Sequence, residues 1–418
     1  MTQLLLLFLL QIFTSLTSAD NHDYPGFSLE VTNHGNVVYS VILNVGSEMQ
    51  PLQVYLSTFS SVTYFELFQT CQRGFNSELS KSYSTTNITM TSDYIKQNIS
   101  GTVAVDIISV SEMPEGLHKQ NLLASNSCSL DQGPLVGALG LGYSQGNSQG
   151  KYSLLQQYFS QGLIYNEAFS LYLDNIETNQ TSKNSKLIIG GWNLDDYAKD
   201  PNKGFTYHIV PKQNAHWSLM LKNIYFVGAG YFVDSPATID IVYPGILIPQ
   251  PLIGQIYRIV NSTKTCFVAK YSLMCDCSIK NDITDITFTI DNSNYTISKD
   301  KFVIENSGAC SVLISESPTP SWLLGQVFVK NFYTIWNFGN NSIGFAELKE
   351  HKKNHSSKSS VISRNWIIII IVIISALIIG TAIGVIFIIR KKSKARRESL
   401  TSRDSFMTTE EENSRMLN

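Results

Sequence analysis

The chain has 418 residues, with 31 lysines and arginines against 33 aspartates and glutamates, so its formal net charge is −2. This balance gives no electrostatic case for nucleic-acid binding, and the length allows two or three domains. The six cysteines are an even number and lie between Cys71 and Cys310, which favours disulfide bonds formed in an oxidising compartment.

The first residues predict a targeting segment. An apolar run extends from Leu4 to Phe13, and the small residues Thr17-Ser18-Ala19 follow it. This order is typical of a secretory signal peptide, which we place at 1–19, although no lysine or arginine precedes the apolar run. A buried N-terminal strand and an uncleaved anchor are the alternatives.

The body of the chain has an all-β pattern. Short runs rich in Val, Ile, Tyr, Phe and Thr recur between stretches of Asn, Ser, Asp and Gly. We expect a first strand over 37–46 and helices over 152–161 and 253–260. Ser57 lies 83 residues before Gly140 (140−57), and Asp240 lies 85 before Gly325 (325−240). This weak duplication predicts two similar β lobes, over 20–195 and 196–348, with a cleft between them.

One segment resembles the active-site strand of the pepsin-like aspartic peptidases. That family writes two apolar residues and then Asp-Thr-Gly-Ser-Ser. Here the order is Val54-Tyr55-Leu56-Ser57-Thr58-Phe59-Ser60-Ser61, with Ser57 at the position of the aspartate and Phe59 at that of the glycine. Further similar motifs follow in the family's order: Leu139-Gly140-Leu141-Gly142-Tyr143, Leu187-Ile188-Ile189-Gly190-Gly191, Trp322-Leu323-Leu324-Gly325-Gln326 and Gly344-Phe345-Ala346. The resemblance covers about Val37 to Leu348 and implies the bilobal pepsin-like fold.

The family repeats its aspartate motif in the second lobe, with a proline nine residues after the aspartate. Asp240, in Ile239-Asp240-Ile241-Val242-Tyr243, has Pro249 at that distance, so it stands at the second position. Asp234 is the alternative, but neither the proline nor the Gly325 spacing fits it. Asp240 as an ordinary buried or hydrogen-bonded aspartate is the other interpretation.

The residues that differ from the family's active-site motifs affect the catalytic chemistry. Aspartic peptidases share one proton between two close carboxyl groups, and a serine hydroxyl does not titrate near neutral pH. Family threonines after each aspartate also brace the lobes; Thr58 remains, but we expect that Ile241 cannot donate. Phe59 and Val242 place side chains where the family has glycine. The resemblance therefore implies an inactive domain that binds an extended peptide or protein segment, with a divergent active endopeptidase as the alternative.

The family also has a tyrosine-bearing hairpin, the flap, over its cleft. The segment 93–101 matches its spacing with Tyr94 as the flap tyrosine, and an ordinary strand aromatic is the alternative. The resemblance further implies that Cys310 pairs with Cys275 or Cys277, Cys266 with the other, and Cys71 with Cys128. A zinc site at Cys275-x-Cys277 has the wrong spacing and no histidine nearby. We expect no metal and no cofactor.

Two Gly-x-Ser-x-Gly matches, at 142–146 and 146–150, suggest a serine hydrolase, with His208 or His216 downstream. No doubly wound pattern surrounds them, so a polar loop is the simpler interpretation. Seven Asn-x-Ser/Thr sequons predict N-glycans: Asn87, Asn98, Asn179, Asn261, Asn294, Asn340 and Asn354.

The C-terminal part predicts a membrane anchor. Residues 349–365 are a polar stalk, and 366–389 are a continuous apolar run without charge. Such a run is long enough to cross a bilayer, and the basic cluster from Arg390 to Arg397 places the tail, 390–418, in the cytosol. We expect a single-pass type I membrane glycoprotein with a lumenal or extracellular ectodomain, at the cell surface or in endolysosomal membranes.

Overall fold

A computed structural model describes residues 23–349, except 25, 95–96, 111–117, 129–132, 144–152, 175–180, 262–265, 270–271 and 307. The expected signal peptide, most of the stalk, the apolar run 366–389 and the tail lie outside these residues. Among the residues described, none of the helices combines the length and the apolar character needed to span a bilayer.

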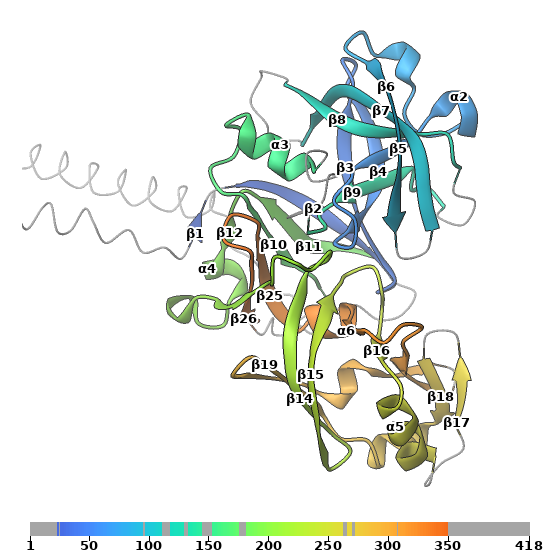
Figure 1. Ribbon diagram of the computed structural model, residues 1–418, viewed down its shortest axis with the longest axis vertical. Helices are drawn as coiled ribbons and strands as arrows, with labels where there is room; N and C mark the ends of the chain where they lie inside the picture. Colours follow the sequence, from blue (N-terminus) through green and yellow to red (C-terminus); the bar gives the residue numbers. More distant parts are fainter. Residues whose placement is uncertain are drawn as a thin grey trace, which may run out of the picture. The chain divides into compact units, whose positions relative to one another are not determined.

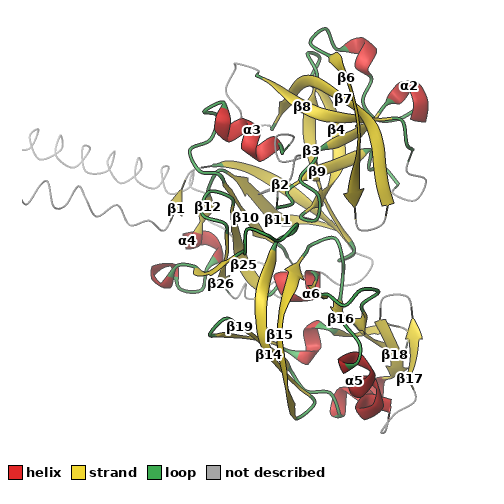
Figure 2. Ribbon diagram, viewed as in Figure 1, coloured by secondary structure: helices red, strands yellow, loops and turns green. Residues whose placement is uncertain are grey.

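The described chain is mostly β-sheet (Figures 1 and 2). The largest sheet has 13 strands in the order β13-β26-β25-β10-β11-β2-β3-β4-β9-β5-β8-β7-β6. Its strands are β2 (Phe27–His34), β3 (Val38–Val45), β4 (Gln50–Ser57), β5 (Tyr64–Glu66), β6 (Ser84–Tyr94), β7 (Gln97–Ser109), β8 (Lys119–Ser125), β9 (Gly137–Gly140), β10 (Ala168–Tyr172), β11 (Thr181–Ile189), β13 (Thr206–Ile209), β25 (Phe332–Asn337) and β26 (Ser342–Glu347). Strands from both ends of the described chain thus share one sheet.

A 7-stranded sheet, in the order β20-β19-β14-β15-β24-β16-β23, belongs to the second half of the chain. It contains β14 (Ser218–Phe226), β15 (Ala229–Ile239), β16 (Ile246–Ile248), β19 (Ile286–Ile290), β20 (Ser293–Ile297), β23 (Ile314–Glu316) and β24 (Trp322–Leu324). Two small sheets complete the set: β17 (Cys266–Ala269), β18 (Ser272–Asp276), β21 (Val303–Asn306) and β22 (Ala309–Val312) in one, β1 (Asp23–Tyr24) and β12 (Trp192–Asn193) in the other.

The helices are short: α2 (Phe68–Cys71), α3 (Leu154–Ser160), α4 (Leu194–Tyr197), α5 (Leu252–Asn261) and α6 (Gln326–Val329), with 3₁₀ turns at Ser77–Leu79, Pro201–Lys203, Cys277–Asn281 and Lys299–Lys301. The predicted second helix agrees with α5 to within a residue at each end. The first predicted helix, 152–161, is shorter in the structure: α3 begins at Leu154, because Ser153 is its extended N-cap residue, and ends at Ser160.

The duplication expected from spacing appears in the strand pairing. Strand β4 runs parallel to β9 with Ser57 opposite Gly140, and β15 runs parallel to β24 with Ile239 opposite Leu324. The glycines at these crossings have no room for a side chain. A Cβ on Gly140 would lie 2.5 Å from the Val62 backbone, and one on Gly325 would lie 2.2 Å from the Gly245 carbonyl oxygen. Both halves therefore need glycine where the two segments cross.

Aromatic side chains fill the core where the 13-stranded and 7-stranded sheets meet. The Phe328 ring packs edge-on against Phe345 at 5.5 Å, and Tyr295 packs against Phe332 at 5.2 Å. All four are buried. Each large side chain in such a cluster stabilises the fold by about 3–5 kcal/mol relative to alanine.

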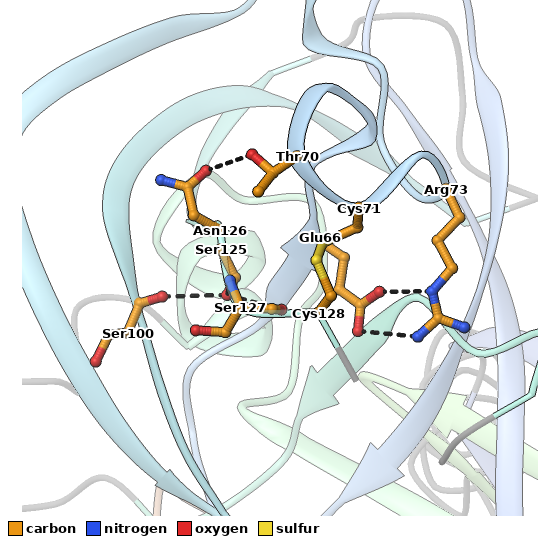
Figure 3. The surroundings of a disulfide bond; sticks show 9 residues. All are labelled: Glu66, Thr70, Cys71, Arg73, Ser100, Ser125, Asn126, Ser127 and Cys128. Atoms are coloured by element: carbon orange, nitrogen blue, oxygen red, sulfur yellow. Dashed lines mark hydrogen bonds and ion pairs between the residues drawn. A yellow bond between two sulfur atoms is a disulfide. The ribbon is translucent and has the colours of Figure 1, made fainter. Parts of the chain in front are cut away.

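Three disulfide bonds link the six cysteines: Cys71–Cys128, Cys266–Cys275 and Cys277–Cys310. These are pairings that the family resemblance allows, and they leave neither Cys275 nor Cys277 as a metal ligand. Figure 3 shows the first bond beside buried Glu66, whose carboxylate accepts from the Arg73 guanidinium Nε at 3.0 Å. The bond closes a separation of 57 residues, which in the chain-entropy account stabilises the fold by about 4 kcal/mol.

Candidate functional site

The two residues singled out in the sequence occupy matching positions in the two halves. Ser57 ends β4, and Asp240 directly follows β15; both are fully buried. The Ser57 carbonyl accepts from the Leu141 amide at 2.7 Å, and the Asp240 amide donates to the Leu324 carbonyl at 3.1 Å. Each residue is thus fixed by the hydrophobic-glycine segment of its own half.

Thr58 links the two halves directly. Its hydroxyl donates to Asp240 Oδ1 at 2.8 Å and accepts from the Ile241 backbone amide at 3.0 Å. The Ile241 side chain has no hydroxyl to donate, as expected, and its backbone amide donates to Thr58 instead. One threonine supplies both a main-chain brace and a partner for the carboxyl group.

The Asp240 carboxyl group is held by protein donors on both oxygens. Oδ2 accepts from the amides of Val242 and Tyr243, each at 3.0 Å, while Oδ1 accepts from Thr58. Burial raises the pKa of Asp240 to about 6, and these hydrogen bonds oppose the shift because they favour the charged form. The group thus changes charge in mildly acidic solution.

The Ser57 side chain has a different environment. Its Oγ accepts from the Ser60 amide at 3.3 Å, a bond within the turn that follows β4. A hydroxyl at this position cannot share a titrating proton with Asp240 in the way that a second carboxyl group does. The arrangement therefore offers one carboxyl group and one alcohol where the paired-carboxylate mechanism requires two acids.

Phe59 points toward the second half of the chain. Its ring stacks on the His216 ring, with centroids 4.1 Å apart and an interplanar angle of 23°. His216 Nδ1 also donates to the Phe59 carbonyl oxygen at 3.3 Å. Burial lowers the pKa of His216, whereas the bond to Phe59 and the charge of Asp93 act to raise it. Next to His216, the Trp217 indole donates to the Leu141 carbonyl at 2.8 Å, which fixes this segment against the first half.

The hairpin β6–β7 contacts the same turn. Ser92 and Ser60, both buried, share a hydrogen bond between their hydroxyl oxygens at 2.8 Å. Tyr94 is the last residue of β6 and pairs with Gln97, but its side chain lies outside the description. Its role as the flap tyrosine stays a prediction.

The remaining candidates lie elsewhere. Asp234 is exposed on β15, where Lys222 Nζ donates to its carboxylate at 2.6 Å. Asn87, Asn98, Asn294 and Asn340 have exposed side chains, while those of Asn179, Asn261 and Asn354 lie outside the description. The serines at 144 and 148 also lie outside it. His208 is buried and bonds Asp291 and Tyr295.

Sequence reasoning missed the roles of His216 and Ser92. Neither belongs to a local motif, because each reaches the Ser57–Ser60 turn only through the fold. His216 is 157 positions from Phe59, and Ser92 is 32 from Ser60.

Comparison with known proteins decides the family. Residues 38–348 match the family model described as "Eukaryotic aspartyl protease". The chain belongs to this family. It is 25% identical over 351 residues to cathepsin E-A of Xenopus laevis, which covers 79% of this chain and 84% of that protein. It is 24% identical over 330 residues to pepsin A of Bos taurus, covering 76% and 86%. Vacuolar protease A of Aspergillus fumigatus is 24% identical over 356 residues, covering 80% and 84%.

Proposed function

We propose that this aspartyl protease domain is catalytically inactive and binds an extended peptide or protein segment between its two halves. The observation that carries the proposal is the surroundings of Asp240. This buried carboxyl group has protein donors on both oxygens, and Ser57 occupies the position that matches it in the other half. General acid–base catalysis typically supplies about 10²–10⁴-fold in rate, and it is lost without the second acid.

The stacked pair of Phe59 and His216 supports the same proposal. The half-buried rings lie next to Thr58, whose hydroxyl holds the Asp240 carboxyl group. A ligand that binds beside these rings contacts an aromatic surface in place of a glycine turn. Such a surface favours binding of apolar or aromatic side chains.

We further propose that the chain is a single-pass type I membrane glycoprotein of the secretory pathway. The three disulfide bonds favour an oxidising compartment. The uncharged run 366–389 followed by Arg390 to Arg397 favours a membrane anchor with a cytosolic tail. A glycosylation reporter fused after Asn418 tests the orientation: it should stay unmodified while the domain carries glycans.

The decisive experiment is a peptidase assay. The full chain, purified in detergent, is incubated with denatured protein from acidic to neutral pH, with and without pepstatin. We expect no pepstatin-sensitive cleavage. Cleavage that disappears both with pepstatin and in Asp240→Asn contradicts the proposal.

Pepstatin-sensitive cleavage that requires Asp240 would support the alternative, a divergent endopeptidase that uses this residue. One observation favours it: the raised pKa of Asp240, about 6, lies where a general acid or base works in mildly acidic solution. In that case the assay shows a rate that depends on pH near this value.

A further inference from the structure

A pocket of about 500 Å³ lies away from the Ser57–Asp240 region, between the edge of the 7-stranded sheet and the last strand of the 13-stranded sheet. Its lining includes Asn294 and Tyr295 of β20, Thr206 of β13, and Phe345 and Glu347 of β26. The volume is in the range of pockets that hold small organic ligands. It is large enough for the first sugar units of a glycan.

The floor of the pocket is built from fixed aromatic side chains. The Tyr295 ring packs against Phe345 with centroids 5.2 Å apart, and its hydroxyl bonds His208 Nε2 at 2.6 Å. His208 Nδ1 bonds the Asp291 carboxylate at 2.7 Å. Because His208 belongs to β13, this chain of bonds joins the two sheets beneath the pocket.

Charged side chains stand at the rim. Lys203 Nζ lies 3.4 Å from Glu347 Oε1, and both groups are well exposed. They offer hydrogen-bond donors and acceptors above an aromatic floor. A sugar ring presents hydroxyl groups at its edge and C–H groups on its faces, so its chemistry matches both parts of the pocket.

The position of Asn294 ties this pocket to a modification site. Asn294-Tyr295-Thr296 is a sequon, and the Asn294 side chain is exposed. Its Oδ1 accepts from Thr289 Oγ1 on the neighbouring strand β19 at 2.8 Å. Strand β20 is the edge strand of its sheet, and Asn294 is among the residues that line the pocket.

We propose that Asn294 carries an N-linked glycan whose first sugars occupy this pocket and join β20 to β26. Covalent attachment holds the sugars at a high effective concentration beside the pocket, so that even a weak contact is populated. The proposal goes beyond peptide binding and requires only that the chain enters the secretory pathway. It gives the glycan a structural role at the junction of the two sheets.

The test compares glycans on one molecule. The full chain is expressed in a eukaryotic secretory host, treated with an endoglycosidase in the native state, and analysed by glycopeptide mass spectrometry. Asn340, which is exposed and lies outside the pocket lining, is the internal reference. We expect release at Asn294 to be at least about tenfold slower than at Asn340, because packed sugars must first separate from the protein. After denaturation the two rates should be equal.

Two variants separate the pocket from other causes. Thr206→Trp fills the pocket from an exposed position and should bring native release at Asn294 to the Asn340 rate without loss of occupancy. If this variant misfolds, Lys203→Ala serves instead. It should speed native release of the Asn294 glycan, because it removes a hydrogen-bond donor at the rim. An unmodified Asn294, or equal native release at Asn294 and Asn340 in the unmutated chain, overturns the proposal. Binding of added chitobiose to a chain with unmodified Asn294 would assign the pocket to a free ligand instead. None of these readouts depends on peptidase activity.

Discussion

The Phe59 ring stacks on the His216 ring across the two halves of the chain, with centroids 4.1 Å apart. Phe59 directly follows Thr58, whose hydroxyl holds the Asp240 carboxyl group. The residue that replaces the family's glycine therefore makes its own contact with the other half of the chain. At this position a single replacement removes the glycine of the family's motif and adds a contact between the two halves.

Phe59→Ala should destabilise the fold by about 1–3 kcal/mol, because it removes a half-buried ring and a stacked pair. It should also lower the affinity for a peptide with apolar or aromatic side chains, since it removes half of the aromatic surface that we propose they contact. Chemical denaturation and peptide titration measure the two effects. Phe232→Ala is the matched control, because that ring is 80% exposed. Unchanged peptide affinity in Phe59→Ala would place the ligand elsewhere.

Asp240→Asn should flatten the pH dependence of stability. The pKa of Asp240 in the folded chain, about 6, exceeds its ordinary value of 3.8, so the native state binds the proton more tightly. This group therefore lowers stability as pH rises from about 4 to about 6, by roughly 3 kcal/mol for a shift of about two units. Urea unfolding at several pH values measures the effect. An identical slope in the variant would show that another group causes the dependence.

Thr58→Val should destabilise the fold by about 2–4 kcal/mol at neutral pH, because it removes the hydroxyl that donates to Asp240 Oδ1 and accepts from the Ile241 amide. Since the lost bond favours the charged form, the pKa of Asp240 should rise further. The defect should therefore shrink in acid. Thr58→Ser keeps the hydroxyl and is the control; a serine variant as unstable as the valine variant would point to packing instead of hydrogen bonding.

Ser57→Asp alone should not produce a peptidase. It restores the second acid, but the Phe59 ring still covers the adjoining space and Val242 still replaces glycine. The informative comparison is the variant with Ser57→Asp, Phe59→Gly, Ile241→Thr and Val242→Gly. Pepstatin-sensitive turnover is the measurement, and circular dichroism checks that each variant folds. Activity in the single variant would show that sterics do not matter here.

The sequence by itself determined the family and the all-β character. Ordered motifs separated by the right distances identify β4, β9, β15 and β24, because hydrophobic strands and obligatory glycines are local features. The proline spacing selected Asp240 over Asp234. The structure places Asp240 at the junction of the halves, and Asp234 has an exposed side chain on β15.

Tertiary structure alone decided how the site residues meet. The Thr58 hydroxyl and Asp240 are separated by 182 positions, and Phe59 and His216 by 157. No local pattern encodes such contacts, since they depend on where two sheets place the ends of their strands. The pocket beside Asn294 could not be predicted from the sequence for the same reason: a sequon specifies an attachment site, but only the fold brings strands β20, β13 and β26 together around it.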